Sequence, residues 1–161
     1  MRFLAPVLLI ALALSTPADA QNQVAFGGLK GDPTKPVEVT SDSLAVNQSD
    51  GTAIFTGNVL VIQGDMRLTA AELTVVYSAE DQKKIESLTA TGGVTLTAGP
   101  DAAESQDAVY TIDSGQVVMT GNVLLTQGAN IISGQKLTVD LKTGTGNMDG
   151  RVKTVLTPEK K

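Results

Sequence analysis

Apolar and polar residues alternate along most of this chain. From Val37 onward, Val, Leu and Ile alternate with Thr, Ser, Asp and Lys at a period of two, which is the pattern of half-buried β-strands. Glycines inside the longer runs indicate bends or bulges, so that a run can fold as two strands. The sequence therefore predicts an all-β protein, with a polar loop at 79–85. The predicted strands cover residues 37–40, 44–46, 52–62, 66–78, 85–97, 103–112, 116–126, 130–141 and 146–156.

The chain contains an internal repeat. The segment 56–64, Thr-Gly-Asn-Val-Leu-Val-Ile-Gln-Gly, returns at 120–128 as Thr-Gly-Asn-Val-Leu-Leu-Thr-Gln-Gly, a shift of 64 positions without gaps. At the same shift, Leu73-Thr74-Val75 returns as Leu137-Thr138-Val139, and weaker copies of the glycine motif lie near 92 and 150. Repeats of this size are typical of stacked architectures, in which one unit cannot bury its apolar face alone.

Charged residues in the predicted strands take the parity opposite to the apolar residues. Glu38 lies between Val37 and Val39, and Asp140 follows Val139. One face of the sheet is therefore predicted to carry no charge along the whole chain. The predicted members of this inner face are Val37, Val39, Leu44, Val46, Phe55, Val59, Val61, Leu73, Val75, Tyr77, Val94, Leu96, Tyr110, Val123, Leu125, Leu137, Val139, Leu141, Val152 and Leu156.

The first twenty residues have the features of a secretory signal peptide. Arg2 provides the positive start, residues 3–14 are apolar, and residues 18–20 have the small-x-small form of a cleavage site. The apolar run is shorter than the roughly 20 residues of a membrane-spanning helix. We therefore expect cleavage between Ala20 and Gln21 and export of the mature chain.

The mature chain is expected to form one domain. Residues 21–36 are rich in Gly and Pro and are predicted to be a flexible, exposed N-terminal lead. The domain is predicted to cover 37–157, followed by a mobile tail at 158–161. Since the chain has no Cys, an exported protein of this sequence forms no disulfide.

The residue types exclude most catalytic chemistry. The absence of His and Cys removes Ser-His, Cys-His and His-metal sites. Asp42, Asp107 and Asp113 could meet in space as paired carboxylates, but turn and surface roles explain them better. No calcium-loop pattern is present. We therefore predict no enzymatic activity, no metal and no cofactor.

The charge and the aromatic content argue against two classes of ligand. The formal net charge is −5 and the cations are scattered, whereas nucleic acids require clustered cations. Aromatic residues make up 3% of the chain and there is no Trp, so few rings are present to stack on sugars or bases. The apolar inner face then has two interpretations: a filled core, or a partly open groove for a long apolar ligand. Periodicity does not choose between them.

Three segments together resemble the OstA-like family. They are 37–44 (Val-Glu-Val-Thr-Ser-Asp-Ser-Leu), 55–64 (Phe-Thr-Gly-Asn-Val-Leu-Val-Ile-Gln-Gly) and 151–158 (Arg-Val-Lys-Thr-Val-Leu-Thr-Pro). The resemblance covers about 37–158. It implies an open, V-shaped antiparallel β-jellyroll whose strands stack rung on rung.

The same resemblance implies a periplasmic lipopolysaccharide-binding bridge that carries lipopolysaccharide to the outer membrane. Lipid A acyl chains would lie in an apolar β-groove, and copies would join head to tail. The implied partners are LptC with the inner-membrane LptB, LptF and LptG transporter, and the N-terminal domain of LptD at the outer membrane. The expected groove residues are Val37, Val39, Leu44, Val46, Phe55, Val59, Val61, Leu73, Val75, Tyr110, Val123 and Leu125. The expected assembly edges are Val37, Glu38, Val39 and Thr40 at one end and Val152, Lys153, Thr154, Val155 and Leu156 at the other.

Two other functions compete with the lipid bridge. The first is a structural, self-assembling β-solenoid with a filled core and no lipid ligand. The second is a β-helix enzyme acting on polysaccharides, which the missing aromatic and catalytic groups disfavour.

Overall fold

The computed structural model describes residues 23–25 and 29–158, which form a single antiparallel sheet of 13 strands. The described residues contain no helix, so the all-β prediction is confirmed. The predicted signal peptide lies outside the described residues, as do residues 159–161 of the tail. The strands are β1 (Gln23–Ala25), β2 (Glu38–Thr40), β3 (Ser43–Asn47), β4 (Thr52–Gln63), β5 (Met66–Tyr77), β6 (Ile85–Thr91), β7 (Val94–Ala98), β8 (Asp101–Ser105), β9 (Asp107–Thr111), β10 (Gln116–Gln127), β11 (Asn130–Asp140), β12 (Thr145–Asp149) and β13 (Lys153–Val155).

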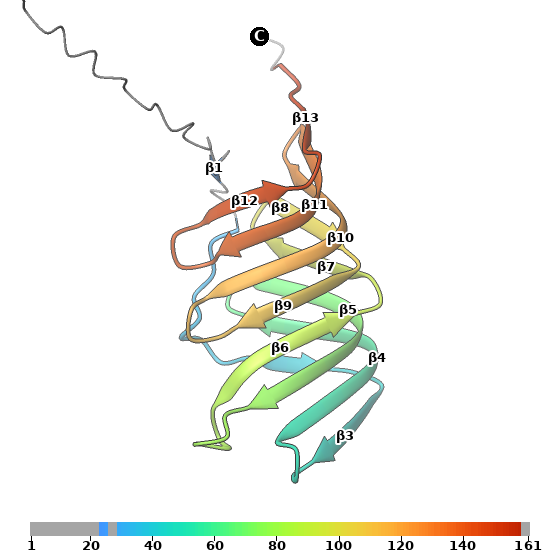
Figure 1. Ribbon diagram of the computed structural model, residues 1–161, viewed down its shortest axis with the longest axis vertical. Coiled ribbons are helices and arrows are strands. Elements are labelled where there is room, and N and C mark those ends of the chain that lie inside the picture. The colour runs from blue at the N-terminus through green and yellow to red at the C-terminus, as the bar shows by residue number, and fades with distance from the viewer. Residues whose placement is uncertain (1–22, 26–28, 159–161) are drawn as a thin grey trace, which may run out of the picture.

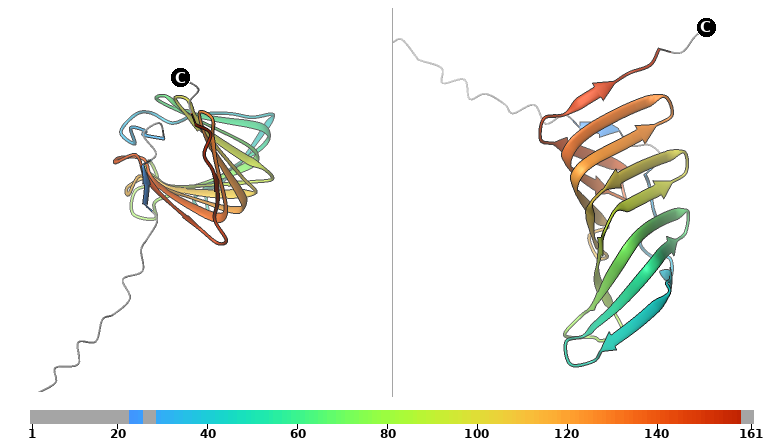
Figure 2. Two further views of the ribbon diagram at one scale, coloured as in Figure 1. Left: turned by 90° about the horizontal axis from the view of Figure 1, so that it is seen from above. Right: turned by 90° about the vertical axis from the view of Figure 1, so that its right-hand side faces the viewer.

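The strands stack along the long axis and bend into two walls (Figures 1 and 2). The first wall contains β2, β7, β8 and β13, and the second contains β1, β3, β6, β9 and β12. The long strands β4, β5, β10 and β11 cross from one wall to the other. For example, β5 pairs with β7 through residues 66–69 and with β6 through residues 72–77. The two walls meet at a corner and form the predicted V.

Glycine makes the corner possible. Strand pairing is interrupted at Gly57-Asn58 in β4 and at Gly121-Asn122 in β10, where φ is positive at all four residues. A Cβ on Gly121 would lie 2.8 Å from Oε1 of Gln106 on the adjacent rung. Because a side chain there meets both a steric contact and an unfavourable backbone conformation, the repeated Thr-Gly-Asn-Val motif is explained as the corner of each repeat.

The inward faces of the two walls pack against each other in the middle of the molecule. Twelve residues of the predicted inner face are at most 2% exposed. These are Val59, Val61, Leu73, Val75, Val94, Leu96, Tyr110, Val123, Leu125, Leu137, Val139 and Leu141. The prediction of an inner face without charge is wrong at Asp101, which follows the inward parity of β8 and is buried. Its carboxylate accepts a hydrogen bond from Nε2 of Gln127 at 3.2 Å.

Part of the N-terminal lead packs onto the sheet. We expected residues 21–36 to be exposed, but Leu29 is fully buried in the core and β1 pairs with β12. Leu29 is a large apolar residue, so its burial removes from water the apolar surface that an exposed tail would leave in contact with it. The predicted polar loop at 79–85 is confirmed up to Lys84, whose ammonium pairs with Asp113 at 3.0 Å.

Candidate functional site: the interior of the V

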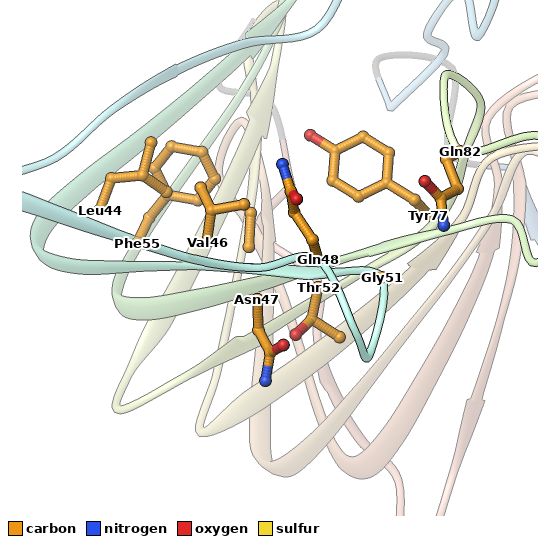
Figure 3. Close-up of a pocket in the computed structure, with 10 residues that line it drawn as sticks. Leu44, Val46, Asn47, Gln48, Gly51, Thr52, Phe55, Tyr77 and Gln82 are labelled. Atoms are coloured by element: carbon orange, nitrogen blue, oxygen red, sulfur yellow. The ribbon is translucent and has the colours of Figure 1, made fainter.

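The interior opens at the end of the sheet formed by β3 and β4. A cavity of about 320 Å³ is lined there by apolar groups of Leu44, Val46, Phe55 and Tyr77. Figure 3 shows these side chains on one side of the sheet, whereas Asn47 points to the other. Leu44 and Val46 are 54% and 63% exposed, which is unusual for aliphatic residues of inward parity. We call this apolar surface the end pocket.

Residues 29–36 bridge the two free lips of the V, and we call this segment the strap. The backbone N–H of Gly31 donates to the carbonyl oxygen of Leu141 at 2.9 Å, directly after β11 in the second wall. Gln63, the last residue of β4 in the first wall, donates from Nε2 to the carbonyl oxygens of Pro33 at 3.2 Å and Lys35 at 2.9 Å. The strap therefore lies across the mouth of the central interior.

A buried polar pair joins the walls beneath the strap. Tyr110, from β9, donates its hydroxyl to Oε1 of Gln63 at 2.8 Å. Burial raises the pKa of Tyr110 to about 12, although the hydrogen bond with Gln63 opposes the shift. The predicted strand 52–62 ends one residue before Gln63, so its inward position was not expected. The period-two series Val59, Val61, Gln63 contained the information that places it on the inner face.

The two ends of the sheet are unlike each other. At one end β2 and β3 are edge strands, and all five residues of β3 are exposed. At the other end β13 is an edge strand of the first wall, and Leu156 beyond it is 70% exposed. The residues predicted as assembly edges thus lie at opposite ends of the stack.

The three carboxylates considered for catalysis occupy separate structural positions. Asp42 accepts a hydrogen bond from Asn58 at the corner, at 2.9 Å. Asp113 pairs with Lys84 on the lip of the second wall, and Asp107 begins β9. Among the described residues, no group of three or more Asp or Glu is placed to hold a metal ion. Turn, corner and surface roles account for all three.

Comparison with known proteins identifies the family. The family model described as LptA/(LptD N-terminal domain) LPS transport protein matches residues 38–145, which is more than half of the chain. The chain belongs to this lipopolysaccharide-transport family. The expected resemblance is therefore confirmed, and the role of the family is transport. No helix among the described residues is long and apolar enough to cross a membrane.

Individual relatives agree with this assignment. The lipopolysaccharide export system protein LptA of Haemophilus influenzae is 29% identical over 81% of this chain and 81% of its own length. The LPS-assembly protein LptD of Yersinia enterocolitica is 43% identical, but over 40% of this chain and 8% of its own length. The crystal structure of LptH, the LptA homologous periplasmic component of the lipopolysaccharide transport device of Pseudomonas aeruginosa, matches 80% of this chain and 99% of that one, with a TM-score of 0.71 at 22% identity. This structural match confirms the β-jellyroll fold.

Proposed function

We propose that this chain is a periplasmic lipopolysaccharide-binding bridge between the inner and outer membranes. Its family is one of lipopolysaccharide transport, and the observation that carries the binding role is the end pocket. Exposed aliphatic side chains of inward parity are costly unless something apolar covers them. Acyl chains fit this surface, because each buried methylene contributes about 0.8 kcal/mol.

The end pocket is the first acyl-chain contact in this proposal. Leu44, Val46 and Phe55 contact the acyl chains there, together with Val37 and Val39 on the neighbouring wall. The remaining proposed groove residues are Val59, Val61, Leu73, Val75, Tyr110, Val123 and Leu125, which are buried between the walls. Acyl chains reach those residues only when the walls separate or the strap moves.

The proposed partners follow from the family and from the exposed edges. LptC, with the LptB, LptF and LptG transporter, delivers the lipid, and the N-terminal domain of LptD receives it. Copies of the chain join head to tail through the β2 and β13 edges. Every neighbouring pair of strands along the first wall, from β2 to β13, is antiparallel. Strand β2 of a next copy would continue this order beside β13, which supports the proposed contact.

A filled structural solenoid is the second candidate. The packed middle of the molecule favours it, since twelve predicted inner-face residues are buried among other protein side chains. Under this alternative the end pocket only stacks on another copy. Lipopolysaccharide that copurifies with the protein at a defined stoichiometry distinguishes the bridge from the solenoid.

The substitution Val46→Asp tests the binding role. Val46 is exposed within the end pocket, so a carboxylate there keeps its hydration in the free protein and leaves folding intact. It must lose that hydration when acyl chains cover it. We expect lipopolysaccharide affinity to fall at least about tenfold, measured by titration with unfolding monitored by circular dichroism.

The matched control is Ala45→Asp, which places the same charge one residue away on the opposite face of β3. Ala45→Asp is expected to bind as the unsubstituted chain does. Equal affinities for all three proteins would contradict a role of the end pocket in lipid binding.

A further inference from the structure

The chain contains its own example of how one repeat docks on the next. Strands β2 to β7 form the first repeat and β8 to β13 form the second. Between the repeats, β8 pairs with β7 in the first wall and β9 pairs with β6 in the second wall. This junction is the interface of two stacked units inside one molecule.

The outer ends of the molecule are equivalent to the two sides of this junction. By the 64-residue repeat, β2 and β3 correspond to β8 and β9. Strands β12 and β13 correspond to β6 and β7, because they pair with β11 as those strands pair with β5. Asp149 lies opposite Lys136 as Thr91 lies opposite Glu72. The end of one copy is therefore built to receive the beginning of another.

The internal register predicts the register between copies. In the internal junction Tyr110 lies opposite Leu88 and Val109 opposite Thr89. When this register is applied to β12 of one copy and β3 of the next, Val46 of the next copy lies opposite Gly146, and Ala45 of the next copy lies opposite Asn147. In the first wall, Ala98 lies opposite Asp101 at the internal junction. The equivalent residues between two copies are Leu156 of one copy and Val37 of the next. The exposed Leu44, Val46 and Leu156 side chains all follow the inward parity in this arrangement.

The receiving edge of β12 is occupied by β1 of the same chain. Gln23, Val24 and Ala25 pair antiparallel with Asn147, Gly146 and Thr145. These are the partners that the transferred register gives to Ala45, Val46 and Asn47 of the next copy, in the same strand direction. Strand β1 thus occupies the position of β3 from a second copy, with Val24 at the position of Val46.

We propose that the edge of β12 is the docking site for β3 of a second copy, and that β1 is a displaceable cover of this site. This rests on the proposed head-to-tail assembly and adds its register and its control. Strand β3 has five residues against three in β1, so the exchange adds backbone pairs along the five-residue strand β12. It also covers Leu44 and Val46, which are exposed in the single chain. Until β1 leaves, it occupies the backbone N–H and C=O groups of the β12 edge, which would otherwise be open to pairing with any exposed strand.

The double substitution Val24→Pro with Ala25→Pro tests the cover. In an edge strand, every second residue turns its N–H group toward the partner strand. One of two consecutive residues therefore donates to β12, and replacing both by proline removes at least one hydrogen bond between β1 and β12. We expect self-association at least about tenfold tighter than that of the unsubstituted chain, measured by analytical ultracentrifugation. The control Val24→Ala with Ala25→Val keeps the composition and every N–H, and is expected to associate as the unsubstituted chain does. Unchanged or weaker association of the proline variant overturns the proposal.

A cysteine pair tests the register in the same proline background. The chain has no Cys, so Asn147→Cys with Ala45→Cys forms only intended disulfides, and the two positions lie at opposite ends of one copy. We expect disulfide-linked ladders on oxidation, at lower yield when β1 is intact. The control Asn147→Cys with Val46→Cys places the second thiol on the opposite face, where no disulfide forms. Equal yields for both pairs, or equal yields with and without the prolines, contradict the proposed docking. Lipopolysaccharide binding measured on the same proteins separates this outcome from a failure of the proposed function.

Discussion

At the residue scale, one hydrogen-bonded pair connects the two walls across the apolar interior. The hydroxyl of Tyr110 and the amide of Gln63 satisfy each other, and the remaining amide donors reach the strap. A buried polar group without a partner costs about 1–3 kcal/mol, so this arrangement depends on all three parts being present. Period-two parity predicted that Tyr110 points inward. It did not predict the partner, because Gln63 and Tyr110 come from different repeats and meet only through the bend of the sheet.

The raised pKa of Tyr110 predicts a loss of stability in strong alkali. The unfolded side chain loses its proton near pH 10, whereas the folded one keeps it to about pH 12. The stabilising contribution is therefore complete below pH 10 and is lost as the pH rises from 10 to 12. We expect the free energy of unfolding in urea to fall over this window by roughly 2 to 3 kcal/mol from this group. Tyr110→Phe removes this component, and an equally steep fall in the Phe variant would show that Tyr110 is not responsible.

The corner glycines differ from the turn glycines in what a side chain would meet. Gly121→Ala combines a positive φ of 86° with close contact to Gln106, whereas Gly128→Ala has a φ of 59° and nothing within 4 Å. We expect Gly128→Ala to lower the free energy of unfolding by about 1 kcal/mol, the cost of the left-handed conformation. Gly121→Ala should cost clearly more in the same urea titration. Equal losses would mean that the corner tolerates a side chain.

At the scale of the elements, the strands were largely predictable and the N-terminal segment was not. Every predicted run from 37 to 156 contains at least one strand, and the runs divided by glycine at 92 and 150 fold as separate strands. Alternation is local, so it is visible in the sequence. The strap and β1 contact the other end of the chain through backbone groups, and backbone pairing leaves little trace in residue type. Leu29, the one buried residue of the described stretch 29–36, lies among Gly and Pro residues that indicate an exposed segment.

A disulfide across the mouth of the V tests whether lipid uses the central interior. A Cβ built on Gly31 lies 3.5 Å from Cβ of Leu141, within the range of a disulfide. In the variant Gly31→Cys with Leu141→Cys, oxidation fixes the strap and reduction frees it. Acyl chains that need the central interior must displace the strap, so we expect at least about tenfold weaker lipopolysaccharide binding in the oxidised form. The reduced protein is the matched control. Equal affinity in both forms would confine the lipid to the end pocket.

At the scale of the whole molecule, the sheet combines a packed middle with apolar surface at both ends. The alternation along the chain is compatible with both a filled core and an open groove, and the structure contains a part of each. Burial could not be assigned along the inner face because parity gives the side of a strand, not the distance to the opposite wall. The family, by contrast, was evident from three short segments, since the corner motif, the first strand and the last strand are each fixed by their positions in the stack.

Site-specific photo-crosslinking to lipopolysaccharide tests the central claim most directly. A photoreactive side chain replaces Phe55, which faces the end pocket, or Ile54, its neighbour of opposite parity on the same strand. Further inward positions are Val39 and Leu44, and Glu38 and Lys153 serve as further outward controls. Because successive residues of a strand face opposite sides of the sheet, labelling should alternate. The account predicts crosslinks at the inward positions and none at Ile54, Glu38 or Lys153, and labelling of both parities to the same extent would contradict it.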